Sequence, residues 1–141
     1  MITFVCGELC SGKTFYSNVL VELNKAVYIE VGDLVRSIKQ SQDRKVLQDS
    51  KKLTAAIVAA ISSTIARNPR KNYVICGVRQ KAILKAFLHA TMIWINCPKE
   101  DRRSRYTMRA RTGDTMTFEE AEKGDKKLGI DKVKQYILEK K

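Results

Sequence analysis

The sequence predicts an α/β fold with three layers, in which helices cover both faces of a parallel sheet of four or five strands. Four short apolar runs rich in β-forming residues occur along the chain, each with the length of a buried strand. Segments with apolar residues at helical spacing separate these runs, and tight hairpin signals between them are rare. Strands joined through helices require right-handed crossovers, so the sheet should be mostly parallel.

Strands and helices are expected to alternate. The expected strands are Ile2–Cys6, Ala26–Val31, Tyr73–Cys76 and Thr91–Asn96. The expected helices are Lys13–Leu23, Leu34–Gln42, Lys52–Arg67, Gln80–His89, Arg102–Arg111 and Phe118–Leu128. Asn68-Pro69 ends the third of these helices. The segment Lys134–Leu138 is the candidate for a short fifth strand.

Length and composition indicate one soluble globular domain over residues 1–141. The chain is 44% hydrophobic and 30% charged, which is typical of a folded protein and not of a disordered one. No apolar run approaches the ~20 residues that span a bilayer, and the N-terminus lacks a signal-peptide pattern. We therefore expect a cytoplasmic protein with no membrane partner.

The formal charge of +12 is unevenly distributed. From Leu34 to Lys85 there are twelve Lys and Arg and two Asp, a net charge of 12 − 2 = +10. Such an excess favours phosphate-bearing partners, although a solvated basic surface explains it equally well. The four cysteines form no CxxC pair and the chain has one His, so a zinc site is not expected.

The segment Gly7-Glu8-Leu9-Cys10-Ser11-Gly12-Lys13-Thr14 fits the pattern GxxxxGK[ST] without a mismatch. In this pattern backbone N–H groups surround phosphate oxygens, the lysine reaches the β- and γ-phosphates, and the hydroxyl binds Mg²⁺. A strand precedes the loop and a helix follows it, which refines the expected fold to that of a P-loop NTPase. ATP and Mg²⁺ are the expected cofactors, with Thr14 as metal ligand. The residues expected to bind the nucleotide are Gly7, Cys10, Ser11, Gly12, Lys13 and Thr14.

Two arginines follow predicted strands at the carboxyl edge of the sheet, where open α/β folds bind ligands. Arg36 comes after the second strand and Arg79 after the third. Arginine grips phosphate through two parallel hydrogen bonds, so both are candidates for binding an anionic second substrate. Asp33 is a candidate for orienting the attacking acceptor oxygen or serving the metal, and a helix N-cap before Leu34 is the alternative.

These segments resemble nucleoside monophosphate kinases. GDLVR at 32–36 is similar to their GD-L-x-R segment, in which the arginine grips the acceptor phosphate. VICGVR at 74–79 is similar to the strand-to-arginine segment of adenylate kinases, dephospho-coenzyme A kinases and phage deoxynucleotide monophosphate kinases. The resemblance implies that Arg36 and Arg79 bind the acceptor phosphate.

A third segment resembles the lid of the dephospho-coenzyme A kinase-like group. It comprises RYTMRAR at 105–111, then Asp114, then TFEE at 117–120, and LGI at 128–130 is also similar to that group. The resemblance implies a lid over about 99–127 whose Arg105, Arg109 and Arg111 stabilise the transferring phosphoryl group. Independently, Arg102, Arg105 and Arg109 share one helical face, which an anion would stabilise. Packing of this basic helix on the acidic Glu119-Glu120-Glu122 stretch is the alternative.

Two features depart from the family pattern. Cys76 stands where many relatives carry an Asp that orders Mg²⁺-bound water, so Glu30 or Asp33 is a possible substitute. The chain after Ile130 is also shorter than is usual, so the adenine pocket must be minimal.

Together these features predict a kinase that transfers the γ-phosphoryl group of ATP to a nucleoside or deoxynucleoside monophosphate. Lys13, Asp33, Arg105, Arg109 and Arg111 are its expected catalytic residues, and Asp33, Arg36 and Arg79 bind the acceptor. One alternative is a kinase of a polynucleotide 5′-end or of dephospho-coenzyme A. Another is a non-catalytic nucleotide-binding module that engages nucleic acid. For the kinase, nucleic-acid binding should be weak and non-specific, and the oligomeric state stays open.

Overall fold

The computed structural model describes residues 1–41, 50–109 and 116–140. Its centre is a four-stranded parallel sheet in the order β2-β3-β1-β4. The strands are β1 (Ile2–Gly7), β2 (Val27–Glu30), β3 (Tyr73–Cys76) and β4 (Thr91–Ile95). All four lie where the sequence predicts them, with boundaries that differ by one residue at most.

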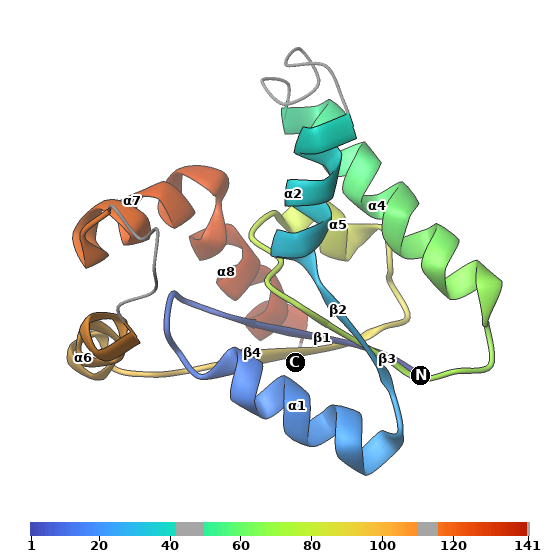
Figure 1. Cartoon of the computed structure of the whole chain (residues 1–141), viewed down its shortest axis with the longest axis horizontal. Helices are drawn as coiled ribbons and strands as arrows, with labels where there is room; N and C mark the ends of the chain where they lie inside the picture. The colour runs from blue at the N-terminus through green and yellow to red at the C-terminus, as the bar shows by residue number, and fades with distance from the viewer. Residues whose placement is uncertain (42–49, 110–115, 141) are drawn as a thin grey trace.

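Seven helices occur in the described part of the chain. They are α1 (Lys13–Asn24), α2 (Val31–Ser41), α4 (Ser50–Arg67), α5 (Lys81–Lys85), α6 (Lys99–Arg109), α7 (Phe118–Leu128) and α8 (Ile130–Lys140). Helix α1 packs on one face of the sheet, and α8 packs against β1 and β4 on the other, with α4 and α5 beside it (Figure 1). The arrangement is the predicted α/β fold with helices on both sides of a parallel sheet.

The predicted strand at 134–138 is wrong, because these residues belong to α8. Ile130, Val133 and Ile137 are buried at helical spacing and join the hydrophobic core. A stripe of period three to four places all three side chains on one face of a helix, whereas a strand would divide them between two faces. The described sheet therefore has four strands.

Several predicted helix boundaries also require correction, among them the start of α6 at Lys99, three residues before the predicted Arg102, and the start of α4 at Ser50, two residues before the predicted Lys52. Helix α5 ends at Lys85, short of the predicted His89, since the Phe87 and Ala90 amides bond to carbonyls three residues back. Phe87 then packs on Phe4, with ring centroids 5.4 Å apart. Helix α2 begins at Val31, three residues before the predicted Leu34, and Val31 is itself buried.

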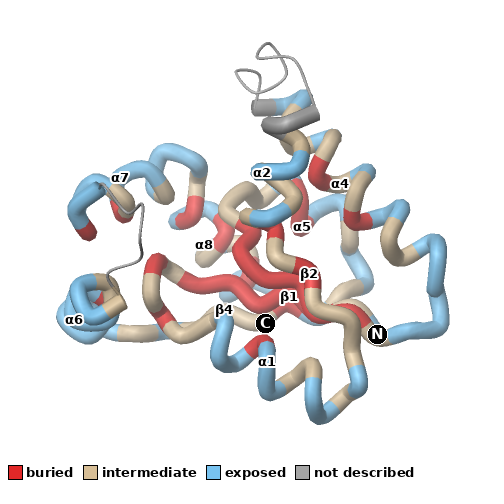
Figure 2. Tube along the Cα trace, in the orientation of Figure 1, coloured by how far each residue is buried: buried red, intermediate tan, exposed pale blue. Residues whose placement is uncertain are grey.

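The core lies around the two central strands, β1 and β3, as Figure 2 shows. Among its largest fully buried side chains are Phe4, Ile61, Tyr73, Ile75 and Leu84. Strands pair with β1 on both edges, and α1 and α8 cover its two faces, so its side chains can be buried almost completely.

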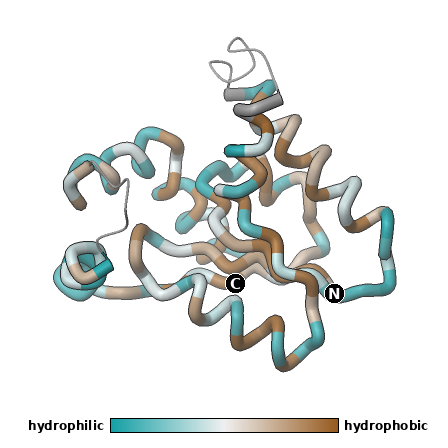
Figure 3. Tube along the Cα trace, viewed as in Figure 1, coloured by the Kyte–Doolittle hydropathy of each residue, from teal (hydrophilic) through white to brown (hydrophobic). Residues whose placement is uncertain are grey.

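Helix α1 forms where the spacing of its apolar residues predicts, but several of these apolar side chains face solvent. Phe15 and Leu23 are about three-quarters exposed and Val19 is 42% exposed, whereas Ser17 is fully buried. Figure 3 shows hydrophobic segments on this helix at places that Figure 2 marks as exposed. Burial of Ser17 is possible because its hydroxyl donates to the Lys13 carbonyl at 2.7 Å.

Within the described ranges, no helix combines the length and the apolar character needed to cross a bilayer.

Candidate functional site

The loop between β1 and α1 is folded so tightly that two of its positions require glycine. A Cβ atom on Gly7 would lie 2.3 Å from Ser11 Oγ and 3.1 Å from the Ile95 carbonyl oxygen. Gly12 has φ of +94°, in the left-handed region that glycine adopts without strain. Glycine is thus required at the two positions for different reasons, at Gly7 by close contacts and at Gly12 by the backbone conformation.

Lys13 and Ser11 present polar groups at this loop. The Lys13 ammonium donates to the Glu8 carbonyl at 3.5 Å, and burial lowers the Lys13 pKa. Ser11 Oγ is buried and, among the described residues, makes no hydrogen bond. Thr14 is exposed in the first turn of α1. The loop therefore lies at the positive end of a 12-residue helix with a partly buried lysine, an arrangement that favours an anion.

Helix α6 approaches this loop with one of its predicted arginines. Arg105 Nη1 donates to the Cys10 carbonyl at 3.4 Å, and it would lie 3.1 Å from a Cβ on Gly12. Arg109 lies over the Tyr106 ring, 5.1 Å from its centroid. Arg111 lies outside the described residues. Of the three expected lid arginines, the structure brings Arg105 to the loop.

The sequence predicts an exposed Arg102 on the same helical face as Arg105 and Arg109. In the structure Arg102 is instead buried at the junction of α6, α7 and the loop. Its Nη2 pairs with Glu122 at 2.8 Å and with Glu8 at 3.2 Å. Its Nε donates to the Cys97 carbonyl at 3.2 Å. The alternative interpretation, packing of the basic helix on acidic residues, is therefore right for Arg102 and for the Arg103–Glu119 pair at 3.0 Å.

Glu122 is the buried acid of this junction. Burial by itself would raise its pKa, but hydrogen bonds from Arg102 and Lys99 outweigh burial, so the pKa is lowered. A carboxyl with a lowered folded pKa contributes stability above its ordinary pKa, and this stability is lost as the pH falls through the folded pKa. The Arg102–Glu122 pair should therefore weaken in acid.

We expect Glu122→Gln to destabilise the fold by about 3 kcal/mol, because among the described residues it leaves Glu8 as the one acidic partner of the buried Arg102 guanidinium. Glu119→Gln is the matched control on the same helix, since the Arg103–Glu119 pair is exposed and should contribute less than about 1 kcal/mol. Urea unfolding at neutral pH measures both. Equal losses in the two variants would show that burial of Arg102 is not what stabilises the junction.

Arg36 and Arg79, the two arginines predicted to bind an acceptor phosphate, line one cavity at the carboxyl ends of β2 and β3. Its volume is about 410 Å³, and it is bounded by Gly32, Arg36, Gly77 and Arg79, among others. Arg36 pairs with Asp33, and Arg79 Nε pairs with Asp125 Oδ1 at 2.9 Å. The structure therefore places both arginines at this edge of the sheet, as the sequence predicts.

Asp33 is the third residue of α2 and stays 70% exposed beside Arg36. The N-cap interpretation is wrong, because the helix begins two residues before Asp33. Its carboxylate accepts from Arg36 on the next turn.

The Glu30 carboxylate acts electrostatically on the loop lysine, where it favours the charged form and so tends to raise the pKa of Lys13. It sits at the end of β2 and accepts from the Tyr28 hydroxyl at 2.6 Å. Gly77, with φ of +92°, makes room for it, since a Cβ there would come within 2.5 Å of Glu30 Oε1. Of the two predicted substitutes for the missing Asp, Glu30 is the one whose charge acts on the loop lysine.

Asp125 is a site residue that sequence reasoning missed. It comes from α7, is mostly buried, and contacts Arg79 while also acting electrostatically on Lys13. Burial raises its pKa against the opposing influence of Arg79 and Lys13. Nothing in its local spacing marks it, because only the tertiary placement of α7, which packs on α6 and α8, brings it there.

Cys76 ends β3 with its side chain fully buried, in register with Glu30 of β2. Burial raises the pKa of the thiol, and the Glu30 carboxylate adds to that effect. Ser17 and Tyr28 lie beside it. Lys13 lies close enough to favour the thiolate, so the thiol is near the loop but enclosed by protein.

We expect Cys76→Asp to lower the free energy of unfolding by at least about 2 kcal/mol, because it adds a buried carboxylate beside Glu30. Cys76→Ser is the size-matched neutral control. Adding Glu30→Gln to Cys76→Asp should recover part of the loss by removing the like charge. A Cys76→Asp variant that is as stable as the parent and more active with Mg²⁺ would instead show that the position faces bound phosphates.

No protein-family model matches the chain, and no curated protein matches its sequence. Solved structures do resemble it. An uncharacterized protein from Eubacterium ventriosum aligns over 93% of this chain and 74% of its own, with 17% identity and a TM-score of 0.63. TT1252 from Thermus thermophilus aligns over 78% and 72%, with 14% identity and a TM-score of 0.55.

A chain in the structure of the Pnkp1/Rnl/Hen1 RNA repair complex aligns over 99% of this chain, with 14% identity and a TM-score of 0.65. This chain spans only 45% of that longer one. At such identities the similarity establishes the α/β fold and nothing about chemistry.

Proposed function

We propose that this protein is a P-loop kinase that transfers the γ-phosphoryl group of ATP to the phosphate of a nucleoside or deoxynucleoside monophosphate. One observation carries the proposal. A loop with the GxxxxGK[ST] pattern and a cavity with two arginines lie at the same edge of the sheet, and Lys13 and Arg79 interact electrostatically there. A donor and an acceptor phosphate bound at these places would be neighbours, as phosphoryl transfer requires.

The loop supplies the donor side. Its backbone amides and the first turn of α1 would hold the β- and γ-phosphates, and the Lys13 ammonium would replace its long bond to the Glu8 carbonyl with phosphate contacts. The lowered pKa of Lys13 reflects desolvation, and a bound polyphosphate would offset it by stabilising the charged form.

Arg36 and Arg79 would bind the acceptor phosphate. Each is already paired with a carboxylate, Asp33 and Asp125 respectively, which holds the guanidinium at the cavity. An oxygen of the acceptor phosphate would attack the γ-phosphorus, the bond from that phosphorus to the β–γ bridging oxygen would break, and ADP would leave. Arg105, beside the loop, would stabilise the charge on the transferring group, with Arg109 and Arg111 as further candidates.

The residues present fit a magnesium ion that is bound chiefly through substrate phosphates. The Thr14 hydroxyl is exposed at the start of α1, and Glu30 supplies a nearby carboxylate. Within the described ranges no group of three His, Cys, Asp or Glu side chains forms a site by itself. Magnesium keeps several waters and needs only one or two protein ligands when phosphates bind it, and it would neutralise charge on the β- and γ-phosphates.

The test is incubation with ATP, Mg²⁺ and a panel of nucleoside and deoxynucleoside monophosphates, with product diphosphates resolved chromatographically. Conversion of at least one monophosphate, lost in Lys13→Ala, is the expected result. A rival is a nucleotide-binding module that engages nucleic acid with its basic surface. That rival predicts no diphosphate, and oligonucleotide binding whose log K falls with log salt by about 0.9 per phosphate contact.

A further inference from the structure

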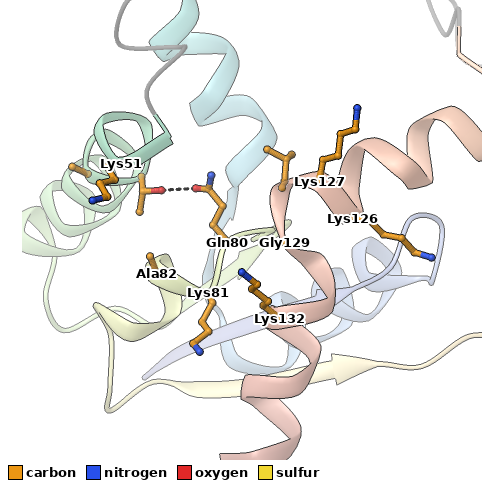
Figure 4. Close-up of a pocket in the computed structure, with 11 residues that line it drawn as sticks. Lys51, Gln80, Lys81, Ala82, Lys126, Lys127, Gly129 and Lys132 are labelled. Carbon is orange, nitrogen blue, oxygen red and sulfur yellow. Dashed lines mark hydrogen bonds between the residues drawn. The ribbon is translucent and has the colours of Figure 1, made fainter.

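A second cavity of about 600 Å³ lies next to the acceptor cavity and is lined by lysines (Figure 4). It is open to solvent and is bordered by α4, α5 and the junction of α7 with α8. Its charged lining residues are all basic: Lys51, Lys81, Lys126, Lys127 and Lys132. No acidic residue lines it, so the cavity carries a concentrated positive charge that the proposed transfer site does not use.

Four of these lysines have no acidic partner within the described part of the chain, namely Lys81, Lys126, Lys127 and Lys132. Lys81 lies over the Tyr136 ring at 6.0 Å. In Figure 4 the Lys132 side chain extends toward Gln80, whereas Lys126 and Lys127 extend away from it. Like charges on flexible stems separate when no anion is present, and a bound anion allows them to converge.

The two cavities are contiguous, since Gln80 and Leu128 line both. Gln80 directly follows the acceptor residue Arg79, and its Oε1 accepts from the Thr54 hydroxyl at 2.6 Å. This bond fixes the side chain at the boundary and leaves its amide N–H groups for another partner. Lys126 and Lys127 directly follow Asp125, which pairs with Arg79. Both the chain and the packing therefore link the lysine cavity to the acceptor site.

We infer that the lysine cavity is a subsite for a second phosphate of the acceptor, carried on the far side of its sugar from the phosphate that Arg36 and Arg79 bind. The inference rests on the proposed function for the identity of the first site. The cavity volume lies in the range of small-molecule pockets and is large enough for a phosphate with its attached sugar. The preferred acceptor is then a nucleotide with a 3′-phosphate or the first residue of a 5′-phosphorylated strand, which share this chemistry.

The test is calorimetric binding of three ligands without ATP: a nucleoside 5′-monophosphate, the matching 3′,5′-bisphosphate and a 5′-phosphorylated dinucleotide. The bisphosphate should bind about tenfold more tightly than the monophosphate. Lys126→Gln/Lys127→Gln/Lys132→Gln should remove this advantage while changing monophosphate affinity by less than about threefold. Lys71→Gln/Lys85→Gln/Lys123→Gln is the control with the same loss of charge, at exposed lysines outside the cavity.

Equal affinities for the monophosphate and bisphosphate, or equal effects of the two triple variants, would overturn the inference. If the dinucleotide also binds more tightly than the monophosphate, the second phosphate belongs to a strand. If only the bisphosphate binds more tightly, it is a terminal 3′-phosphate. Both results support the subsite. Transfer to monophosphates without a bisphosphate advantage would refute the subsite alone. A lysine-dependent advantage without any transfer would refute the kinase proposal and leave the subsite standing.

Discussion

Lys13→Ala is expected to lower turnover by roughly 10²–10³-fold, the effect typical of removing one preorganised charge-stabilising donor. Lys13 begins α1 directly after Gly12, and its ammonium makes a single long hydrogen bond to a loop carbonyl. It is therefore available to the β- and γ-phosphates, and its loss should also weaken ATP binding. Calorimetry measures ATP affinity, and chromatography of the diphosphate product measures turnover.

Lys71→Ala is a matched control for this variant. Lys71 is an exposed lysine in the turn that leads into β3, at the opposite edge of the sheet from the loop. It should change neither ATP affinity nor turnover by more than about twofold, as expected of a solvated surface charge. Unchanged ATP affinity in Lys13→Ala would mean that the loop does not bind the triphosphate.

Arg79→Ala should reduce transfer to a monophosphate by about 10²-fold while leaving ATP affinity within about threefold of the parent. The reason is that Arg79 lines the cavity proposed to bind the acceptor, whereas the donor is proposed to bind at the loop. Arg36→Ala should act in the same direction from the other side of that cavity. Steady-state kinetics with varied monophosphate, and calorimetry with ATP alone, separate the two effects.

The Arg79 variant needs a control for stability, because it leaves Asp125 mostly buried without its ion-pair partner. In Arg79→Ala/Asp125→Asn the unpaired carboxylate is also removed, so this double variant should regain stability but not activity. Arg79→Lys keeps the charge and loses two-point phosphate binding, so its activity should fall between parent and Arg79→Ala. Full activity in the double variant would assign Arg79 a structural role only.

The sequence predicts the fold well because its strands are short, mainly apolar runs with clear ends. All four strands lie at their predicted places, and β1, which is buried on both faces, is apolar apart from Thr3. Helix ends were less predictable, since they depend on tertiary contacts. Burial of Val31 extends α2 backwards, and packing of Phe87 on Phe4 ends α5 early.

The candidate site was predictable where local sequence determines placement. Arg36 and Arg79 follow adjacent parallel strands, so topology alone brings them to one edge. The roles of Asp125 and Arg102 could not be read from spacing. Asp125 reaches Arg79 from a helix 46 residues further along the chain, and Arg102 is buried by partners from two separate segments, Glu8 and Glu122.

The strand order also has a consequence for how the chain folds during synthesis. β1 emerges first but occupies the centre of the sheet, and its partners β3 and β4 begin at Tyr73 and Thr91. The apolar strand β1 therefore stays unpaired until residues 73–76, about halfway along the 141 residues, have been translated, and its second edge until β4 follows. Contacts between such distant segments form slowly, and an exposed strand edge promotes aggregation in the interval. The nascent chain should thus depend on chaperones more than its small size suggests.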